Sequence, residues 1–218
     1  DCYYTVTSMS GRIKPELPGH QLGAGPRPAA FPLPYHETFD GLEVGAEAPF
    51  FGDQEGKWET VPAAGGRSGS ASQQQLTAWP ILEPQCNDHS QPISIIGDLF
   101  FESVRVSADI FIETEGTGAG VALRVRNPGS FFRGVAPGLF FYLGATPAVS
   151  NAMGRQNPGG IAPAPNLPLV GWALCADSYC TKPIKTGNLP AGSPALRGQW
   201  HDVALDVTGG FASGQIDG

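Results

Sequence analysis

The sequence predicts an all-β domain in which antiparallel strands form two stacked sheets. Apolar and polar residues alternate in several short segments, a pattern typical of strands with one buried face. Gly and Pro, with 30 and 21 residues, make up about a quarter of the chain, roughly twice their usual share. No segment carries the apolar stripe of an amphipathic helix. A loop-rich β-sandwich is therefore favoured over a helical fold.

The clearest predicted strand covers residues 104–112, where apolar side chains occupy every second position. A Gly-rich turn at 116–120 leads to a second alternating segment at 121–125. A turn at 127–129 then leads to a third strand at 139–143. Short Gly turns favour antiparallel pairing of consecutive strands, so we expect these segments to pair in sequence order.

The end of the chain predicts a β-hairpin. Val203, Leu205 and Val207 alternate with polar or small residues after Trp200, which we expect to be buried. A Thr-Gly-Gly turn follows at 208–210, and residues 211–216 return. This pattern resembles the late hairpin of concanavalin A-like or laminin G-like sandwiches, jelly-roll folds used mostly to hold carbohydrate. Since no closing strand follows, we expect a C-terminally incomplete sandwich.

Other segments show weaker patterns. Residues 1–7 resemble a strand, and a Gly/Pro-rich linker follows, so we place the main domain at 31–218. We expect a strand at 169–175, a loop-rich entry at 39–58, a polar flexible excursion at 63–75, a surface loop at 144–168 and mostly loop at 181–197. The abrupt start, without Met or a signal peptide, suggests a piece of a longer protein.

Charge and hydropathy exclude two classes of partner. The net charge is −7, and the 13 basic residues are scattered rather than clustered, so nucleic-acid binding is not expected. No apolar run approaches the ~18 residues of a membrane span.

The four cysteines favour an oxidising compartment. Cys175 and Cys180 flank a polar turn and are expected to bridge it, which leaves Cys2 and Cys86 as the most natural second pair. Four reduced thiols are the alternative. A zinc site is not expected, because no Cys-x-x-Cys spacing occurs.

Candidate catalytic residues are weak. A glycosidase needs two carboxylates across a cleft, and the nearest group is Asp109, Glu113 and Glu115. The Glu-x-Asp-x-x-Glu pattern is missing, so we interpret this group as a solvated strand edge. The histidines are isolated, and Ser213 lacks the first Gly of a nucleophile elbow. The four histidines are His20, His36, His89 and His201.

Calcium is the favoured inorganic ligand. Glu37 and Asp40 could supply hard oxygen ligands together with backbone carbonyls, and a plain polar loop is the alternative. Some aromatic residues could stack on sugar rings or touch lipid, although such residues are more often part of the core. These are Phe111, Phe131, Phe132 and Tyr142.

Seven short pieces, in this order and at similar spacing, resemble one enzyme family. They are Tyr4–Thr7, Phe31-Pro32 followed by Tyr35 and Phe39, Phe51–Gly56, Ile93–Asp98, Asp109–Thr114, Leu139–Phe141 and Gly210–Gly214. Together they resemble the C-terminal part of glycoside hydrolase family 59, the galactosylceramidases. The pieces Ser94–Asp98 and Phe211–Gly214 are the most specific.

The resemblance implies a three-part lysosomal enzyme with a TIM barrel that carries both catalytic glutamates, a small β-sandwich and a lectin-like domain. Residues 1–30 would be the end of the small sandwich and a linker, and 31–218 the lectin-like domain. The family reaction, retaining hydrolysis of galactosylceramide, would belong to the parent protein. One acidic calcium ligand of the family is replaced at Thr38, and another would lie beyond Gly218. The connection from Phe141 to Trp200 is longer than the family implies.

The sequence therefore predicts a non-catalytic lectin-like domain that packs on the catalytic barrel and helps shape the substrate cleft. A glycan or glycosphingolipid is a further expected partner, and the expected location is lysosomal or secreted. A stand-alone laminin G-like carbohydrate-binding or adhesion module is one alternative. A concanavalin-like endoglycanase, active as this chain alone, is the other.

Overall fold

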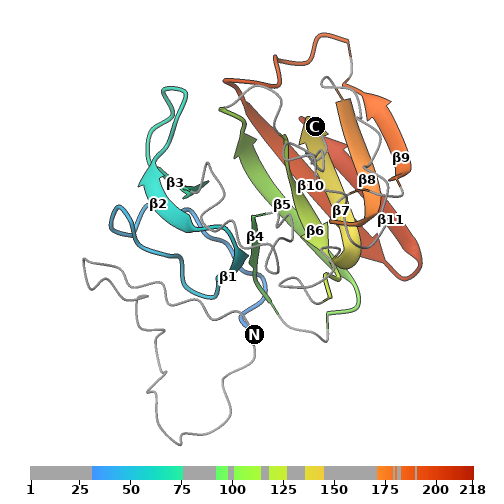
Figure 1. Ribbon diagram of the computed structural model, residues 1–218, viewed down its shortest axis with the longest axis horizontal. Coiled ribbons are helices and arrows are strands. Elements are labelled where there is room, and N and C mark those ends of the chain that lie inside the picture. Colours follow the sequence, from blue (N-terminus) through green and yellow to red (C-terminus); the bar gives the residue numbers. More distant parts are fainter. Residues whose placement is uncertain are drawn as a thin grey trace, which may run out of the picture. The chain divides into compact units, whose positions relative to one another are not determined.

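The computed structural model describes residues 31–75, 92–97, 101–113, 118–126, 136–144, 171–178, 180, 183–189 and 191–218. These residues contain eleven β-strands and no helix (Figure 1), which confirms the predicted all-β class. The described part of the chain has no helix that could span a membrane. Two compact units are present: one contains the described residues up to 75 together with 92–97, and the other those from 101 onward.

The first unit consists of two short antiparallel ribbons. Strand β1 (Gly52–Glu55) pairs with β4 (Ile93–Ile95), and β2 (Trp58–Pro62) pairs with β3 (Ser70–Gln74). The expectation of a flexible excursion at 63–75 was therefore wrong. Strand β3 consists of Ser, Ala and Gln, so it has no apolar alternation to reveal it, and its pairing with β2 creates the strand.

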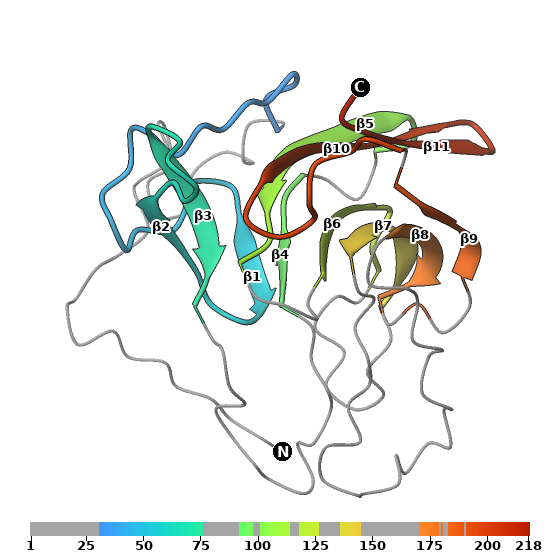
Figure 2. The ribbon, with the colours of Figure 1, turned by 90° about the horizontal axis from the view of Figure 1, so that it is seen from above.

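The second unit is a two-layer antiparallel sandwich. One sheet has the order β11-β10-β5, and the other has the order β6-β7-β8-β9. Figure 2 shows these sheets as two layers, one above the other. The strands are β5 (Val104–Phe111), β6 (Gly118–Leu123), β7 (Pro137–Gly144), β8 (Gly171–Asp177), β9 (Pro183–Asn188), β10 (Trp200–Thr208) and β11 (Phe211–Ile216).

The core lies between these sheets. Both sheets contribute to one cluster of buried apolar side chains, which contains Ile112, Val121, Leu123, Phe141, Leu143, Val203, Leu205 and Val207. The predicted inward face of the late hairpin is confirmed, because Val203, Leu205 and Val207 are all buried. Trp200 is only half-buried and packs on Phe111 with ring centroids 5.3 Å apart.

The predicted pairing of the first two segments was wrong. Strand β5 pairs with β10, whereas β6 pairs with β7 in the other sheet. Val121 and Leu123 of β6 lie in the core cluster against which the inward side chains of β5 pack. Two strands with one apolar face each can bury both faces by stacking, which side-by-side pairing does not achieve. The predicted antiparallel pairing of β6 with β7 is confirmed.

Strand β9 was also missed, because residues 181–197 were expected to be mostly loop. The first four residues of β9 are exposed, and Pro183 and Lys185 interrupt any apolar pattern. The backbone of β9 pairs with β8, and this pairing makes the segment a strand although its side chains do not predict one. The predicted strand at 169–175 corresponds to β8.

A missing side chain on β11 lets the two sheets approach each other. Gly214 lies opposite Leu205 in the β10–β11 ladder. A Cβ atom added to Gly214 would lie 2.6 Å from Cζ of Phe141 in the facing sheet. The Phe141 ring therefore occupies the space that any larger residue at 214 would need.

We expect the substitution Gly214→Ala to lower the free energy of unfolding by about 1–3 kcal/mol, because the methyl group must displace a buried ring. Gly210→Ala is the matched control, since a Cβ there meets nothing within 4 Å, and its effect should stay within about 0.5 kcal/mol. Urea denaturation of both variants checks this. Equal effects of the two substitutions would contradict the packing described.

Candidate functional site

Glu37, one of the two predicted calcium ligands, is held within its own loop. Its Oε1 accepts a hydrogen bond from the Phe39 backbone N–H (2.9 Å), and its Oε2 accepts one from the Tyr35 hydroxyl (2.8 Å). Burial, with a smaller contribution from Glu37, raises the pKa of the Tyr35 hydroxyl well above its ordinary value. This hydroxyl thus remains a donor to Glu37. Phe39 has a positive φ of 64°, so the carboxylate stabilises a turn that bulky residues seldom adopt.

Asp40, the other predicted ligand, joins the same loop to the β2–β3 ribbon. Its Oδ1 accepts a hydrogen bond from the Ser70 backbone N–H at 2.7 Å, at the first residue of β3. A Cβ atom on Gly69 would lie 2.5 Å from this oxygen. Asp40 therefore reaches the backbone of β3 because position 69 has no side chain.

These two carboxylates do not make a calcium site by themselves. Within the described ranges, no group of three or more His, Cys, Asp or Glu side chains could hold a metal ion. Calcium takes about six to eight oxygen ligands, so backbone carbonyls would have to supply most of them. The hydrogen bonds of the loop account for Glu37 and Asp40 without a metal, and calcium binding stays a prediction.

Two substitutions at Asp40 separate these roles. We expect Asp40→Ala to lower the free energy of unfolding by about 0.5–1.5 kcal/mol, since the Ser70 N–H loses its acceptor, while Asp40→Asn keeps Oδ1 and most of the stability. The measurement is thermal unfolding with calcium and with a chelator. If Asp40 binds calcium, the wild type shows a calcium-dependent rise in Tm that Asp40→Ala abolishes and that Asp40→Asn, which keeps a neutral oxygen ligand, reduces.

Three buried polar atoms without hydrogen-bond partners lie on one face of the β2–β3 ribbon. They are Trp58 Nε1, Thr60 Oγ1 and Gln74 Nε2. Trp58 is directly opposite Gln74, and Thr60 is two positions along the same strand, so all three side chains share a face. An unsatisfied buried polar group costs about 1–3 kcal/mol, so these three atoms lower the stability of the β2–β3 ribbon.

The Thr60 hydroxyl gives a direct test, because the residue is only 1% exposed. We expect Thr60→Val, which has nearly the same shape, to leave stability unchanged or raise it by up to about 1–2 kcal/mol. Thr186→Val, at an exposed position of β9, controls for the intrinsic preference of Val for strands. Calorimetric unfolding distinguishes the outcomes. A clear loss of stability in Thr60→Val alone would show that the hydroxyl has a partner in solution.

The outer face of the β5–β10–β11 sheet brings carboxylates beside aromatic rings. Asp109 of β5 lies directly opposite Asp202 of β10, and Phe111 is paired with Trp200 two positions along the ladder, on the same face of the sheet. Directly opposed residues in an antiparallel pair have Cβ atoms about 4.5–5.5 Å apart. Both carboxylates are exposed. The sequence analysis missed Asp202, because it looked for paired carboxylates along a single strand. Asp202 and Asp109 are brought together by the register between two strands, β10 and β5.

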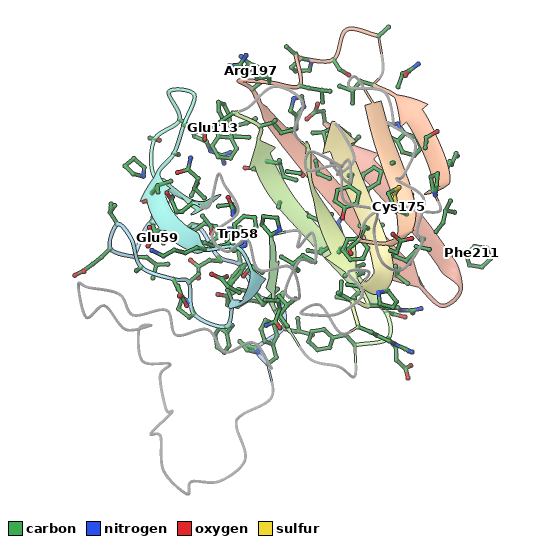
Figure 3. All side chains as sticks on the ribbon, viewed as in Figure 1. Trp58, Glu59, Glu113, Cys175, Arg197 and Phe211 are labelled. Atoms are coloured by element: carbon green, nitrogen blue, oxygen red, sulfur yellow. A yellow bond between two sulfur atoms is a disulfide. The ribbon has the colours of Figure 1, made fainter. Side chains whose placement is uncertain are left out.

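The other residues of the predicted acidic group contribute little to this face. Glu113 is exposed, and its backbone carbonyl accepts a hydrogen bond from Nε of Arg197 at 2.8 Å (Figure 3). Glu115 lies outside the described residues, as do Phe131 and Phe132.

His201 is a structural residue in this fold. It is fully buried, its Nδ1 lies 2.8 Å from Asp217 Oδ2, and its Nε2 lies 3.2 Å from the Ala195 carbonyl oxygen. Asp217 Oδ1 also accepts a hydrogen bond from the Asp202 backbone N–H. Both ring nitrogens are thus engaged, and Ser213 lies opposite Asp206, several ladder positions away. These contacts leave His201 no role as the base of a Ser-His-Asp triad. His36 is exposed, and His20 and His89 lie outside the described residues.

A disulfide joins Cys175 to Cys180, the pair that the spacing predicts. Both cysteines are fully buried. The intervening turn is anchored on β7, where the Tyr142 hydroxyl donates to the Ser178 carbonyl at 2.7 Å. This contact gives Tyr142 a packing role. Cys2 and Cys86 lie outside the described residues.

Comparisons with known proteins agree with this architecture. A family profile described as "Galactocerebrosidase, C-terminal lectin domain" matches residues 53–157. The chain is similar to the C-terminal lectin domain of galactocerebrosidase. Galactocerebrosidase of Danio rerio is 31% identical over 98% of this chain, and the proteins of Macaca mulatta and Homo sapiens are 29% and 28% identical over 100%. The chain spans about 27% of the length of these relatives.

Proposed function

We propose that this chain is the non-catalytic lectin-like domain of a galactosylceramidase-like glycoside hydrolase that acts on β-galactosyl sphingolipids. In this role it packs on the TIM-barrel catalytic domain of its parent chain and helps shape the substrate cleft. The observation that carries the proposal is similarity along the whole chain to proteins named galactocerebrosidase, of which it spans about 27%. A lysosomal or otherwise extracytoplasmic location fits the buried disulfide.

The carboxylates of the described residues support a non-catalytic role. Hydrolysis of a glycosidic bond needs one protonated and one ionised carboxyl group in a site that excludes bulk water. Asp109 and Asp202 instead lie exposed on a sheet face. The catalytic pair of the proposed enzyme therefore belongs to the barrel.

The same sheet face is the candidate for contact with sugar. Phe111 and Trp200 present half-buried rings beside the two carboxylates. Aromatic rings pack against the C–H face of a sugar, and carboxylate oxygens accept hydrogen bonds from its hydroxyl groups. A galactosyl headgroup that reaches the edge of the cleft has both kinds of partner here.

The test compares the isolated chain with its parent protein. We expect no hydrolysis of galactosylceramide by the chain alone, and we expect Trp200→Ala in the parent to raise KM by about threefold to tenfold with little change in kcat. Thr186→Ala, on exposed β9, should leave both constants unchanged. The measurement is steady-state release of galactose. A parent protein without a barrel, or Trp200→Ala kinetics equal to those of the wild type, would contradict the proposal.

The endoglycanase alternative retains one specific observation in its favour. Asp109 and Asp202 lie directly opposite each other in the β5–β10 ladder, and glycosidases use a pair of carboxyl groups. That reading requires the isolated chain to cleave a polysaccharide and to lose this activity in Asp109→Asn and Asp202→Asn. Glu113→Gln serves as the control. The laminin G-like alternative instead requires glycan binding without any barrel in the parent gene.

A further inference from the structure

The inward row of side chains on β10 begins with a histidine. Alternate positions along this strand are His201, Val203, Leu205 and Val207, and all four are buried. The three apolar members belong to the core cluster. A histidine in the same row needs hydrogen-bond partners, because a buried polar group without them destabilises a fold. Its partners therefore indicate which protons the ring carries.

Both ring nitrogens of His201 face hydrogen-bond acceptors. Nδ1 lies 2.8 Å from Oδ2 of Asp217, and Nε2 lies 3.2 Å from the carbonyl oxygen of Ala195. A backbone carbonyl and an ionised carboxylate can only accept hydrogen bonds. A neutral imidazole has a single N–H, so one of its nitrogens would present a lone pair to an oxygen. The doubly protonated ring makes both contacts into hydrogen bonds.

The two contacts attach separate segments to the start of β10. Ala195 lies in the segment 191–199, which stands in the sequence between β9 of one sheet and β10 of the other. Asp217 directly follows β11, and its Oδ1 accepts a hydrogen bond from the Asp202 backbone N–H at 3.1 Å. His201 therefore holds the approach to β10 and the end of β11 together.

Across the β5–β10 ladder, His201 faces an apolar residue. Its direct partner is Ile110, whereas the charged residues of β5, Arg105 and Asp109, alternate with Ile110 along the strand. Alternate residues point to opposite faces of a sheet. Arg105, Asp109 and Asp202 thus lie on the face that His201 does not share.

The other elements packed against β10 bring little charge to the ring. Strands β6, β7 and β11 contain no Asp, Glu, Lys, Arg or His, and the hydroxyl of Tyr142 in β7 donates to the Ser178 carbonyl. Before β10, Nε of Arg197 donates to the Glu113 carbonyl. Burial disfavours a charged imidazole. The carboxylate of Asp217, at 2.8 Å, is the group that favours it.

We propose that His201 is an acid-strengthened latch, whose doubly protonated ring binds Asp217 and the Ala195 carbonyl at the same time. Histidine generally changes its charge between about pH 5 and 8. The folded chain holds the second proton through two hydrogen bonds that the unfolded chain lacks, so the latch adds stability at acidic pH and loses it as the pH rises. At higher pH one of the two contacts is lost. An acidic compartment such as the lysosome would keep the latch closed, although the latch does not depend on that location.

NMR of the imidazole N–H groups tests the protonation state in the unaltered chain. At pH 5, His201 should show two ring N–H signals that exchange slowly with water, because both protons are buried in hydrogen bonds. At pH 8 one of the two signals should be lost. The ring of His36, an exposed residue, is the internal control and should show no slowly exchanging N–H at either pH. A single slowly exchanging N–H of His201 at pH 5 overturns the proposal.

Two variants measure what the latch contributes to stability. His201→Gln cannot gain a proton, so its loss of Tm relative to the wild type should be larger at pH 5 than at pH 8 by about 2–6 °C, as expected for a charge-assisted hydrogen bond in a chain of this length. Asp217→Asn keeps an acceptor oxygen without the charge and should show a smaller difference of the same sign. His36→Gln is the matched control and should change Tm equally at both pH values. Losses of Tm in His201→Gln and Asp217→Asn that do not depend on pH overturn the proposal.

Discussion

The close approach of the two sheets at Phe141 is the constraint on which the sandwich depends. This ring is 3% exposed, lies 5.8 Å from the ring of Trp172, and occupies the space beside the glycine of β11. Leu205, opposite Gly214 in the ladder, is fully buried against the same core. The hairpin can therefore lie flat over β7 only with glycine at that position. The specific piece Phe211–Gly214 in the family resemblance thus coincides with a packing requirement and needs no catalytic explanation.

In the first unit, the carboxylate of Asp53 holds separate strands together. Asp53 Oδ2 accepts a hydrogen bond from the Trp58 backbone N–H at 2.9 Å, and its Oδ1 accepts one from the Ser94 hydroxyl at 2.8 Å. It therefore joins the start of β2 to the β1–β4 ribbon. Two-stranded ribbons are marginal on their own in water, so a contact that joins ribbons matters more than it would in a wide sheet. Two further pieces of the resemblance, Phe51–Gly56 and Ile93–Asp98, meet at this carboxylate.

The sequence predicts strands where apolar side chains form a pattern, and it misses strands that form only because their backbone pairs with a neighbouring strand. Apolar alternation located β5 and β10, because one face of each must be buried, and the apolar run at 139–143 located β7. Strands β3 and β9 have polar or exposed side chains, so their order comes from backbone bonds to β2 and β8, which no local pattern records. Which sheet a strand joins is equally hidden. A short connection permits β5 and β6 to pair or to stack, and only the demand to bury both apolar faces decides.

Sequence reasoning meets the same limit at the candidate calcium site. The residue types of Glu37 and Asp40 suggest calcium ligands, whereas in the fold both carboxylates accept hydrogen bonds from backbone N–H groups. Carboxylates accept hydrogen bonds and never donate them when ionised, and a loop-rich domain has many backbone N–H groups outside any ladder. Among the described residues, acidic side chains accept hydrogen bonds from such groups at several places: Glu37 at Phe39, Asp53 at Trp58, Asp40 at Ser70 and Asp217 at Asp202. Part of the net charge of −7 is therefore structural. Asp109 and Asp202 are exposed and lie directly opposite each other across the β5–β10 pair, so the search for a sugar contact belongs on their face of the sheet.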